Sequence, residues 1–449
     1  MTVIVVGAGL AGLSAARVLV EAGQEVAVLE ARHRVGGRVE GGTIAGHPVE
    51  LGGTWLGEGH SRMHSLVQQL GLETFRTYND EGQLVIESAG RQSRMKSHKG
   101  AVPRLDPFAL ADVAQGLFRF ERMARKTDIE SPWNSAHADE LDAQTFESWI
   151  RRNLRTYGGR SYFRVACEAV FAADAGDISL LHALFYARSN TDFETMLSVD
   201  HGAQQDRVVG GSVRVAEALA DALGDRVRLG QPVRGVRQDH AGVSLELRNG
   251  SQVSGDRVVL AVPPNLVGRL DYDPILPSWR DQLTQKLAAG AVVKAFAAYP
   301  TPFWRADGLN GQAASDLGPV KVTFDVSPPD GAVGVLLGFI DAADARHWVR
   351  LSAADRRRSF LDCLVRYFGP GAAVPMDYVE KDWTAEEFTR GCYGAHFSPG
   401  VWTAYGEALR PPVGRVHWAG AEYATRWNGY MEGAVRSGEA TAAEVLAAA

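Results

Sequence analysis

The hydrophobic and polar positions at the start of the chain predict a strand, a turn, a helix and a second strand. A short apolar run, VIVV at residues 3–6, ends at Gly7, and small or apolar residues then recur at helical spacing from Leu10 to Leu19. The segment EAG ends this helix, and EVAVLE at 25–30 has the apolar content of a buried strand. Residues 3–30 therefore predict a βαβ unit of a doubly wound α/β sheet.

The rest of the pattern divides into a helical stretch and a return to strands. From about residue 76 to 202 the chain is polar and helix-rich with few strand signals, which indicates an insertion. Strands resume in VSLELRNGSQVSGDRVVLAVPP (243–264), where Asn249-Gly250 predicts a type I′ hairpin and RVVLAV a buried strand. VVKAFAAYP (292–300) and GAVGVLLGFI (331–340) predict a second, antiparallel sheet, and the chain ends in a helix.

Composition constrains the class of protein. The 449 residues are 45% hydrophobic, and 47 Lys and Arg against 53 Asp and Glu give a net charge of −6 without long runs of one sign. We therefore expect a globular protein with no nucleic-acid partner. Three cysteines are too few for a disulfide framework or a CxxC metal site, so we expect no metal and a cytoplasmic location. No stretch approaches the ~20 apolar residues of a membrane span, so no membrane contact is expected.

A glycine fingerprint lies between the first strand and the first helix. Gly7, Gly9 and Gly12 form G-x-G-x-x-G, and Glu30 closes the second strand. The first glycine makes the tight turn, the second lets the backbone approach a pyrophosphate, and the third lets helix and sheet pack closely. Glu30 can accept hydrogen bonds from ribose hydroxyls. These features predict a bound dinucleotide, which at this point is either NAD or FAD.

Two further glycine pairs favour FAD. RHRVGGRVEGG follows Glu30 and contains Gly36, Gly37 and Arg38, whose guanidinium fork has the geometry to clamp a diphosphate. ELGGTW at 50–55 adds a second pair through which backbone can approach a flat ligand. A nicotinamide enzyme has no need of these loops, whereas an extended, buried FAD does.

At this point the chain resembles a known family. GAGLAGLSAARVL, RVGGRV, ELGGTW and the C-terminal RVHWAGAEYATRWNGYMEGAVRSGE are similar to segments of the flavin-containing monoamine oxidases, within the flavin amine oxidase superfamily. RVVGGSVRVAEALADALGDRVRLGQPV (207–233) resembles the second FAD-contacting portion of that family, which implies that the backbone of Val233 faces the adenine. The region 85–160 matches poorly. Further cofactor contacts that the resemblance implies are Gly53, Thr54, Trp383, Cys392, Gly420 and Met431.

The resemblance also implies the domain organisation and the reaction. A Rossmann-like FAD-binding domain (1–75, 205–280 and 385–449) is interleaved with an α+β substrate-binding domain (76–204 and 281–384) built on an antiparallel sheet. The expected activity is oxidative deamination, in which FAD takes hydride from the α-carbon of a primary monoamine. The imine hydrolyses to an aldehyde and ammonia, and oxygen reoxidises the flavin to give hydrogen peroxide.

Three residues are expected to act in catalysis. Tyr430 precedes the last helix, whose positive N-terminal end can stabilise charge on the reduced flavin, with Met431 supplying a backbone donor. The resemblance implies that Tyr393 and Tyr430 face each other in front of the flavin and hold the amine between their electron-rich faces. Lys294 interrupts an apolar strand, and the resemblance implies a water-mediated contact to flavin N5 with Trp383 packed nearby.

The substrate class rests on the expected cavity wall. The resemblance implies walls formed by Trp55, Tyr186, Gln204 and Val322. A tryptophan at 55 replaces the expected tyrosine and a valine at 322 a bulkier gating residue, which predicts a wider entrance. No acid is clearly placed for the second ammonium of a diamine, although Glu58 or an acid in the unmatched region is an alternative. An L-amino-acid oxidase would need an arginine for the carboxylate, for which Arg188 stays open.

Cys392 has two interpretations. A lone cysteine is ordinarily a packed core residue. The trio GCY (391–393) resembles the place where vertebrate members attach FAD through a thioether, and Gly391 would give the thiol access to the ring edge, whereas Arg390 departs from the small residue expected there. We expect a tether rather than a nucleophile. A homodimer follows by analogy alone, and a flavin-binding protein without turnover is the least favoured function.

Overall fold

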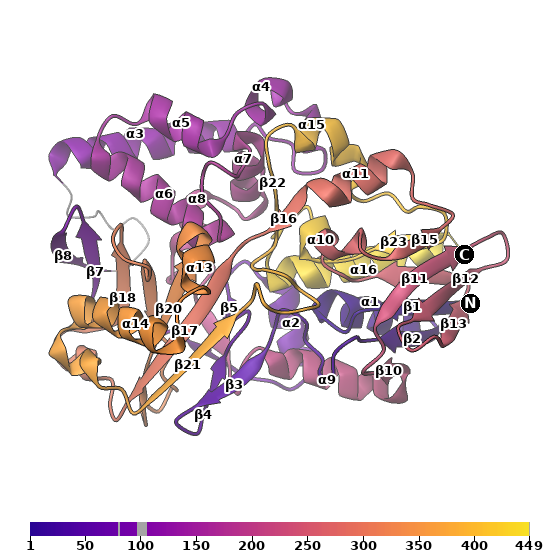
Figure 1. Ribbon diagram of the computed structural model, residues 1–449, viewed down its shortest axis with the longest axis horizontal. Helices are drawn as coiled ribbons and strands as arrows, with labels where there is room; N and C mark the ends of the chain where they lie inside the picture. The colour runs from indigo at the N-terminus through magenta and orange to yellow at the C-terminus, as the bar shows by residue number, and fades with distance from the viewer. Residues whose placement is uncertain (80, 97–105, 449) are drawn as a thin grey trace.

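The first thirty residues fold as the sequence predicts. In the computed structural model, which describes residues 1–79, 81–96 and 106–448 (Figure 1), β1 (Thr2–Val6) leads through a glycine turn into α1 (Leu10–Glu21) and β2 (Glu25–Leu29). Residues 3–6 and 26–29 are buried, as expected of parallel strands covered on both faces. β1 pairs in parallel with β2 and with β14 (Arg257–Leu260), so the βαβ unit is confirmed.

Strands from the middle and the end of the chain complete this parallel sheet. Its order is β10-β2-β1-β14-β23, with β10 (Val227–Arg228) and β23 (Val416–Trp418) at the edges. The helices α9 (Val213–Leu223) and α16 (Met431–Ala447) pack against α1. Gly438 allows α16 to approach closely, because a Cβ there would lie 2.1 Å from the carbonyl oxygen of Ala11. Early, middle and late segments thus share one layer, which confirms the predicted interleaved α/β fold.

A smaller sheet contains the predicted hairpin but not the predicted turn. Its order is β13-β12-β11-β15, formed by β11 (Val233–Gln238), β12 (Val243–Leu247), β13 (Gln252–Gly255) and β15 (Asp271–Asp273). A type I′ turn requires positive φ at both Asn249 and Gly250, and Gly250 alone has it, at +83°. The Gly250 N–H donates to the Leu247 carbonyl (2.9 Å), which is typical of a three-residue loop that ends in a left-handed glycine. The expectation of a type I′ turn was wrong.

The second large sheet is mostly antiparallel, as predicted, and longer than predicted. In the described residues its order is β21-β17-β20-β19-β18-β7-β8. The fully buried strands β17 (Val292–Tyr299) and β20 (Gly334–Asp341) form its antiparallel centre, with β21 (Asp377–Asp382), β19 (Val322–Asp325) and β18 (Leu309–Ser315). The hairpin of β7 (Gln83–Ser88) and β8 (Arg91–Met95) joins β18 in parallel. This hairpin lies in the stretch that we expected to be helical. The expectation missed β8 because its sequence, RQSRM, lacks the alternation of apolar and polar residues that marks a strand.

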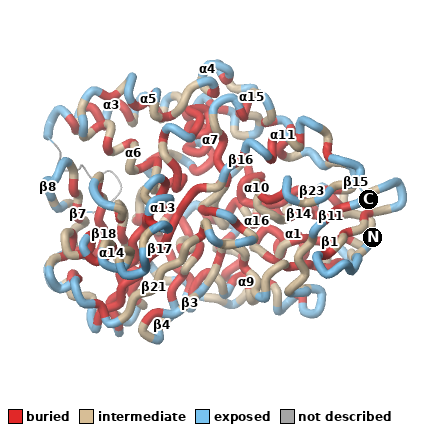
Figure 2. The backbone as a smooth tube through the Cα atoms, viewed as in Figure 1, coloured by how far each residue is buried: buried red, intermediate tan, exposed pale blue. Residues whose placement is uncertain are grey.

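A group of helices lies above this sheet in the view of Figure 1. After β8 the chain forms α3 (Pro107–Ala124), α4 (Ala138–Asp142), α5 (Phe146–Asn153), α6 (Tyr157–Phe171), α7 (Leu180–Ser189) and α8 (Phe193–Leu197). Figure 2 shows that burial is densest along α7 and β17, at the centre of the molecule. The remaining longer helices are α2 (Ser61–Gln69), α11 (Ser278–Lys286), α13 (Ala342–Trp348) and α14 (Ala353–Phe368).

The remaining elements with printed bounds are short. They are β3 (Gly41–Ile44), β4 (His47–Glu50), β5 (Trp55–Leu56), β6 (Thr74–Arg76), β9 (Asp206–Val208), β16 (Leu287–Ala289), β22 (Ala395–Phe397), α10 (Pro264–Val267), α12 (Phe303–Ala306) and α15 (Val401–Tyr405). β16 pairs with β22, and β9 pairs with both β5 and β6. The residue boundaries of the two expected domains stay a prediction.

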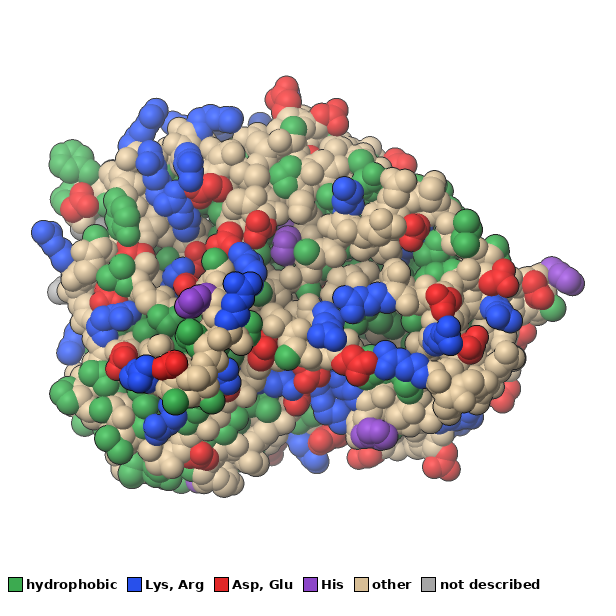
Figure 3. Space-filling model, viewed as in Figure 1, with side chains coloured by type: hydrophobic (Ala, Val, Ile, Leu, Met, Phe, Trp, Pro, Cys, Tyr) green, Lys and Arg blue, Asp and Glu red, His purple; other side chains and the backbone are tan. Residues whose placement is uncertain are grey.

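The surface carries both signs of charge. On the face drawn in Figure 3, basic and acidic side chains lie side by side over most of the area, with basic side chains gathered at the upper left. None of the helices in the described part of the chain combines the length and the apolar character that crossing a membrane requires.

Candidate active site

One cavity joins the nucleotide turn to the expected catalytic residues. It has a volume of about 1080 Å³ and runs from the glycine turn after β1 to the aromatic side chains beside β17 and β20. Nearly all the site residues predicted from the sequence line it: Gly7, Gly9, Glu30, Gly37, Arg38, Gly53, Thr54, Trp55, Tyr186, Gln204, Val233, Lys294, Val322, Trp383, Cys392, Tyr393, Gly420, Tyr430 and Met431. Gly12 lies behind the turn, where it packs against Gly7. The structure therefore brings together residues from both ends and the middle of the chain.

The glycine turn has the shape of a phosphate cradle. Gly7 adopts a φ of +104°, and a Cβ at Gly12 would lie 2.0 Å from the Gly7 carbonyl oxygen, so helix and strand could not pack this closely. Gly36 bridges to Gly9, and a Cβ on Gly37 would lie 3.3 Å from the Gly9 Cα. The pair Gly36–Gly37 thus lies directly on the glycine turn that follows β1. Bare backbone at the N-terminus of α1 is the arrangement that a diphosphate needs.

Glu30 closes the nucleotide end. It is 3% exposed, and its two carboxylate oxygens accept from the N–H groups of Ala8 (2.7 Å) and Arg32 (2.9 Å). Each oxygen keeps a lone pair toward the cavity, since a carboxylate can accept about four hydrogen bonds. The side chain is therefore fixed in place and still able to accept from a ribose.

Arg38 is held by an acid that sequence reasoning missed. Its guanidinium donates to both carboxylate oxygens of Glu422 (2.5 and 2.8 Å) and to the carbonyl of Tyr393 (2.9 Å). Burial acts to lower the pKa of Arg38, but Glu422 reverses this and raises it, while Arg38 holds the pKa of Glu422 below its usual value. Glu422 also accepts from the N–H of Ala395. Its signal in the sequence was an isolated acid in the apolar segment WAGAEYA.

Aromatic rings, partly or fully buried, form the end of the cavity where the amine is expected. Tyr430 immediately precedes α16, as predicted, and its ring lies 6.2 Å from that of Tyr186. Tyr393 lies 6.2 Å from Phe339, on β20. Burial raises the pKa of Tyr186, Tyr393 and Tyr430, so all three phenols stay protonated. Phe339 and its neighbour Phe324 were missed, although their positions on strands that face the cavity would have marked them.

Lys294 is buried but fully hydrogen-bonded. Its Nζ donates to the carbonyls of Glu50 (2.6 Å) and Gly52 (2.8 Å) and to Oγ1 of Thr54 (2.9 Å). Burial lowers the pKa of Lys294 to about 7, opposed by the negative charge of Glu50. All three N–H donors of the ammonium form are used by these acceptors, so a contact to a flavin-bound water would draw on the neutral amine, which has a free lone pair. The sequence identified the buried lysine but not its partners.

Two tryptophans and a glutamine complete the walls. Trp383 donates its Nε1–H to the carbonyl of Leu51 (2.8 Å), beside the Lys294 acceptors. Trp55 packs on Phe324 with ring centroids 4.7 Å apart. Gln204 donates to the Met196 carbonyl (2.9 Å), while among the described residues its Oε1 and the Trp55 Nε1 find no partner. Both of these unpartnered atoms are buried beneath the cavity surface.

Cys392 is a free, buried thiol on the cavity wall. It is 5% exposed, and burial raises its pKa to about 12, with Arg38 acting in the opposite direction. The preceding Gly391 has a φ of +130°, and a Cβ there would lie 2.4 Å from the Gly290 carbonyl oxygen. A glycine is therefore required at 391 so that the backbone can pack against Gly290. This requirement does not depend on the chemistry of the Cys392 thiol.

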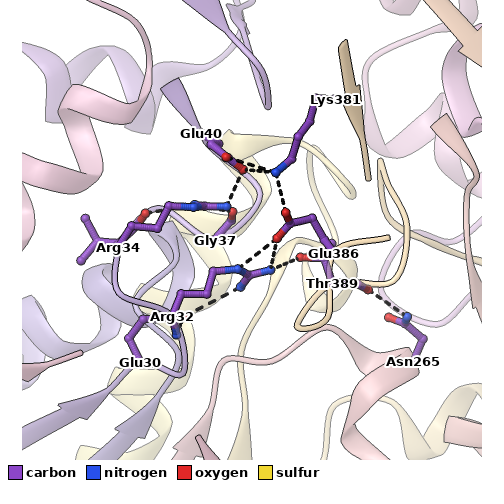
Figure 4. A network of polar contacts seen from close by, with 10 residues as sticks. Glu30, Arg32, Arg34, Gly37, Glu40, Asn265, Lys381, Glu386 and Thr389 are labelled. Atoms are coloured by element: carbon purple, nitrogen blue, oxygen red, sulfur yellow. Dashed lines mark hydrogen bonds and ion pairs between the residues drawn. The ribbon is translucent and has the colours of Figure 1, made fainter. Parts of the chain in front are cut away.

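A polar network holds the loop before Cys392 against the nucleotide end (Figure 4). Arg32 donates to Thr389 Oγ1 (2.6 Å) and to Glu386 (3.3 Å). Lys381 bridges Glu386 (2.5 Å) and Glu40 (2.9 Å). The network joins residues that follow β2 to residues more than 340 positions later, so it holds residues 381–389 against the loop after β2.

The comparisons with known proteins agree with this geometry. The pattern of the flavin containing amine oxidoreductases matches residues 10–446, and the chain belongs to this family. AofH of Mycobacterium tuberculosis, whose name classes it with the flavin-containing monoamine oxidases, is 42% identical over 445 residues, 99% of this chain and 96% of AofH.

Solved structures of amine oxidases also resemble this chain. A putrescine oxidase in which one alanine was changed to cysteine, from a redesign of cofactor binding, superposes with a TM-score of 0.96 at 36% identity, over 100% of both chains. Cyclohexylamine oxidase from Brevibacterium oxydans IH-35A gives a TM-score of 0.94 at 32% identity, over 100% of this chain and 99% of that one. The chain is thus a flavin-dependent amine oxidase, and the predictions of family, fold class and flavin cofactor are confirmed.

Proposed function

We propose that this protein oxidises primary amines, R–CH2–NH2, to aldehydes with release of ammonia and hydrogen peroxide, and that monoamines with apolar side chains are its parent substrates. The observation that carries the proposal is the single cavity that joins the glycine turn to Lys294, Tyr393 and Tyr430. A nucleotide at one end and an aromatic cage at the other is what an FAD-dependent amine oxidation requires.

FAD would lie along the cavity with its diphosphate at the glycine turn. Gly7, Gly9 and Gly37 leave bare backbone there, and Glu30 would hold the ribose. Val233 would face the adenine, while Gly53, Thr54, Trp383, Gly420 and Met431 would surround the flavin ring. Met431 begins α16, and the first N–H groups of a helix have no partner within it, so its N–H can donate to the flavin. Arg38 was expected to clamp the diphosphate, but its guanidinium binds Glu422, so it would lie beside the diphosphate instead.

Bound FAD supplies the acceptor for the hydride that leaves the α-carbon of the amine. The chain's own part is to orient and desolvate the amine: the faces of Tyr393 and Tyr430 would hold the nitrogen in its neutral form. Lys294 would hold the water that contacts the flavin edge. No side chain needs to take the α-proton in this scheme.

The walls support an apolar substrate tail. Trp55, Phe324 and Phe339 form a continuous aromatic surface, and Val322 leaves room beside it. Two residues named for the alternative substrates are exposed: Glu58 pairs with His201 (3.2 Å), and Arg188 lies on the outer side of α7. Neither lines the cavity.

Peroxide release with a panel of amines tests the function. Purified protein should be yellow, and tyramine, phenethylamine, benzylamine or n-butylamine should bleach the flavin under anaerobic conditions. If no amine in the panel reduces the flavin, the proposed function is wrong, and the result would favour a flavin-binding protein without turnover.

We also propose that Cys392 tethers FAD. Its position on the cavity wall supports this, and so does the alanine-to-cysteine change made in putrescine oxidase to redesign cofactor binding. Acid precipitation is the test: yellow colour should follow the wild-type pellet and stay in the supernatant for Cys392→Ala. A homodimer in the reducing cytoplasm remains our proposal by analogy, to be checked by light scattering.

A further inference from the structure

His60 is a fully buried histidine that the proposed mechanism does not use. It lies immediately before α2, in the turn that follows β5. Its Nδ1 accepts from the N–H of Gly57 (2.9 Å), which anchors the imidazole to this turn. Burial and the charges of His64 and Arg436 lower the pKa of His60 to about 3, so the ring stays neutral at any working pH.

The imidazole packs against two aromatic rings at the end of the cavity where the amine is expected. Its centroid lies 4.2 Å from that of Trp427, at 81°, and 5.6 Å from that of Tyr430, at 65°. Trp427 and Tyr430 lie 5.5 Å apart at 77°, so the three rings meet edge to face. His60 and Trp427 do not line the cavity, whereas Tyr430 does. The cluster therefore reaches a ligand only through Tyr430.

Trp427 has a backbone conformation that its surroundings must hold. Its φ is +54°, a region that bulky residues seldom adopt and that persists where neighbouring groups fix it. Its N–H donates to the carbonyl of Ser189 (3.0 Å), and its carbonyl accepts from the N–H of Tyr430 (3.1 Å). A Cβ on Gly59 would lie 2.7 Å from the indole, so the turn before α2 closes directly on this ring.

The other ring of the cage has a separate support. Tyr393 lies 6.2 Å from Phe339 on β20, and its carbonyl accepts from the guanidinium of Arg38. The two halves of the cage are thus held by different residues, and His60 belongs to the half that carries Tyr430. A substitution at His60 should therefore move one ring of the cage and leave the other in place.

We propose that His60 is a positioning residue for amine oxidation: its ring, directly and through Trp427, fixes the orientation of the Tyr430 ring against which the amine is held. This inference rests on the proposed function and deepens it, because it names the residue that sets one wall of the cage. His60 exchanges no proton with the amine and acts only through the place of Tyr430.

The test separates the ring of His60 from its anchor. His60→Ala removes both, whereas His60→Phe keeps a ring and loses the Nδ1 acceptor. In stopped-flow experiments on the holoenzyme without oxygen, the rate constant of flavin reduction by benzylamine should fall roughly 10- to 100-fold in His60→Ala, because a displaced ring misplaces the α-carbon. His60→Phe should recover most of this loss. Reoxidation of the dithionite-reduced enzyme by oxygen should keep its wild-type rate in both variants.

His64→Ala is the matched control. His64 lies on α2 and contacts the same turn, with its Nε2 3.0 Å from the Gly57 carbonyl oxygen, but in the described part of the chain its ring does not contact Trp427 or Tyr430. This variant should reduce its flavin at the wild-type rate. A loss equal to that of His60→Ala would show that the turn matters and not the ring, which would overturn the proposal. Equal falls in reduction and reoxidation would overturn it too, because they indicate a general structural defect.

A second readout needs no turnover. 2-Phenylpropan-2-amine has no α-hydrogen and cannot be oxidised, and its binding in the cage should perturb the visible spectrum of the bound flavin. Its dissociation constant should rise roughly 10-fold in His60→Ala and stay near the wild-type value in His60→Phe. An unchanged constant in His60→Ala, or no spectral change in wild type, would overturn the proposal.

Two further outcomes keep the inference distinct from the proposed function. If no amine is oxidised, the proposed function fails, and the titration with 2-phenylpropan-2-amine still decides whether His60 positions Tyr430. If His60→Ala does not fold, Trp427→Phe takes its place, because the smaller ring leaves a gap between His60 and Tyr430. The same fall in the rate of flavin reduction is then expected, and a wild-type rate would overturn the proposal.

Discussion

The two ends of the cavity are built in different ways. At the nucleotide end, the glycine turn, the Gly36–Gly37 pair and Glu30 all lie within residues 7–38. Their contacts are local: Gly12 against Gly7, Gly36 against Gly9, and Glu30 against Ala8. The amine end takes its side chains from α7, β17, the loop before β22 and the residue before α16. Its lysine is bound to carbonyls 242 and 244 positions away in the sequence. Local structure makes the first, and tertiary packing makes the second.

Because of this difference, the two ends should respond differently to single substitutions. A local turn depends on the conformation of a few backbone units, so one added methyl group disrupts it. An assembled cage depends on many packed contacts, so single changes there alter chemistry or selectivity before they unfold the chain. Arg38 and Glu422 lie where the two ends meet, since the pair also contacts the backbone of Tyr393 and Ala395.

The largest effect is expected at the local end. Gly12→Ala places a Cβ 2.0 Å from the Gly7 carbonyl oxygen, which forces α1 away from the turn. Such overpacking opens the phosphate cradle, so the expected effect is loss of the whole cofactor and not only of stability. We expect purified Gly12→Ala to contain no flavin, as measured by its visible absorbance, and to release no peroxide in a coupled peroxide assay.

Gly176→Ala is the matched control. A Cβ at Gly176 meets no atom within 4 Å, and its φ is not positive. This variant should keep its flavin. A yellow, active Gly12→Ala would show that the turn is not the local device described above.

The next effect lies at the junction. Arg38→Met leaves Glu422, which is 2% exposed, without a cationic partner, and removing one member of a buried pair costs about 3–5 kcal/mol. Urea unfolding should show this loss. Arg34→Met is the control: Arg34 pairs with Glu40 at a position whose side chain is 30% exposed, so about 1 kcal/mol or less is expected. Equal losses in the two variants would contradict the special place of Arg38.

The sequence was sufficient to predict the local structure of the nucleotide end. At the amine end it identified the residues but not their contacts. The fingerprint, the βαβ unit and the two buried central strands followed from periodicity, because hydrophobic patterning and glycine conformations are read directly from the chain. Lys294 was visible as a charge in an apolar strand. Its carbonyl acceptors were not, since any backbone can supply a carbonyl and no residue type marks the choice.

Glu422 and the β7–β8 hairpin show what the residue pattern did not reveal. Glu422 is a single acid whose importance depends on what faces it from other elements. β8 is mostly polar and is held at the sheet edge by pairing with β7, which a pattern of apolar alternation does not report. Asn249-Gly250 signalled its hairpin correctly, and the turn type depended on a backbone conformation at Asn249 that its residue type leaves open.

A smaller effect is expected from the titration of Lys294. Its pKa is about 7 in the folded protein, well below the ordinary value near 10.5, so between these values the unfolded chain binds more protons than the folded one. The free energy of unfolding should therefore rise with pH between about 7 and 9, by at most about 1.4 kcal/mol per pH unit from this group. The free energy of unfolding is measured across this pH range for wild type and for Lys294→Met, and the difference between the two curves isolates the slope that Lys294 contributes. A difference that is flat with pH would mean that Lys294 stays charged at its three acceptors.

The smallest effect is expected at the outer wall. Val322 is partly exposed on β19 and lines the cavity, and its small side chain leaves room beside the ring pair of Trp55 and Phe324. Val322→Tyr would fill that room, so kcat/KM for phenethylamine should fall relative to n-butylamine by roughly 10-fold, the usual size of discrimination in a hydrophobic pocket. Val374→Tyr, at a site that is 82% exposed, should change neither value. If Val322→Tyr instead lost flavin or unfolded, the amine end would be as intolerant as the glycine turn, and the contrast between a local and an assembled end would not hold.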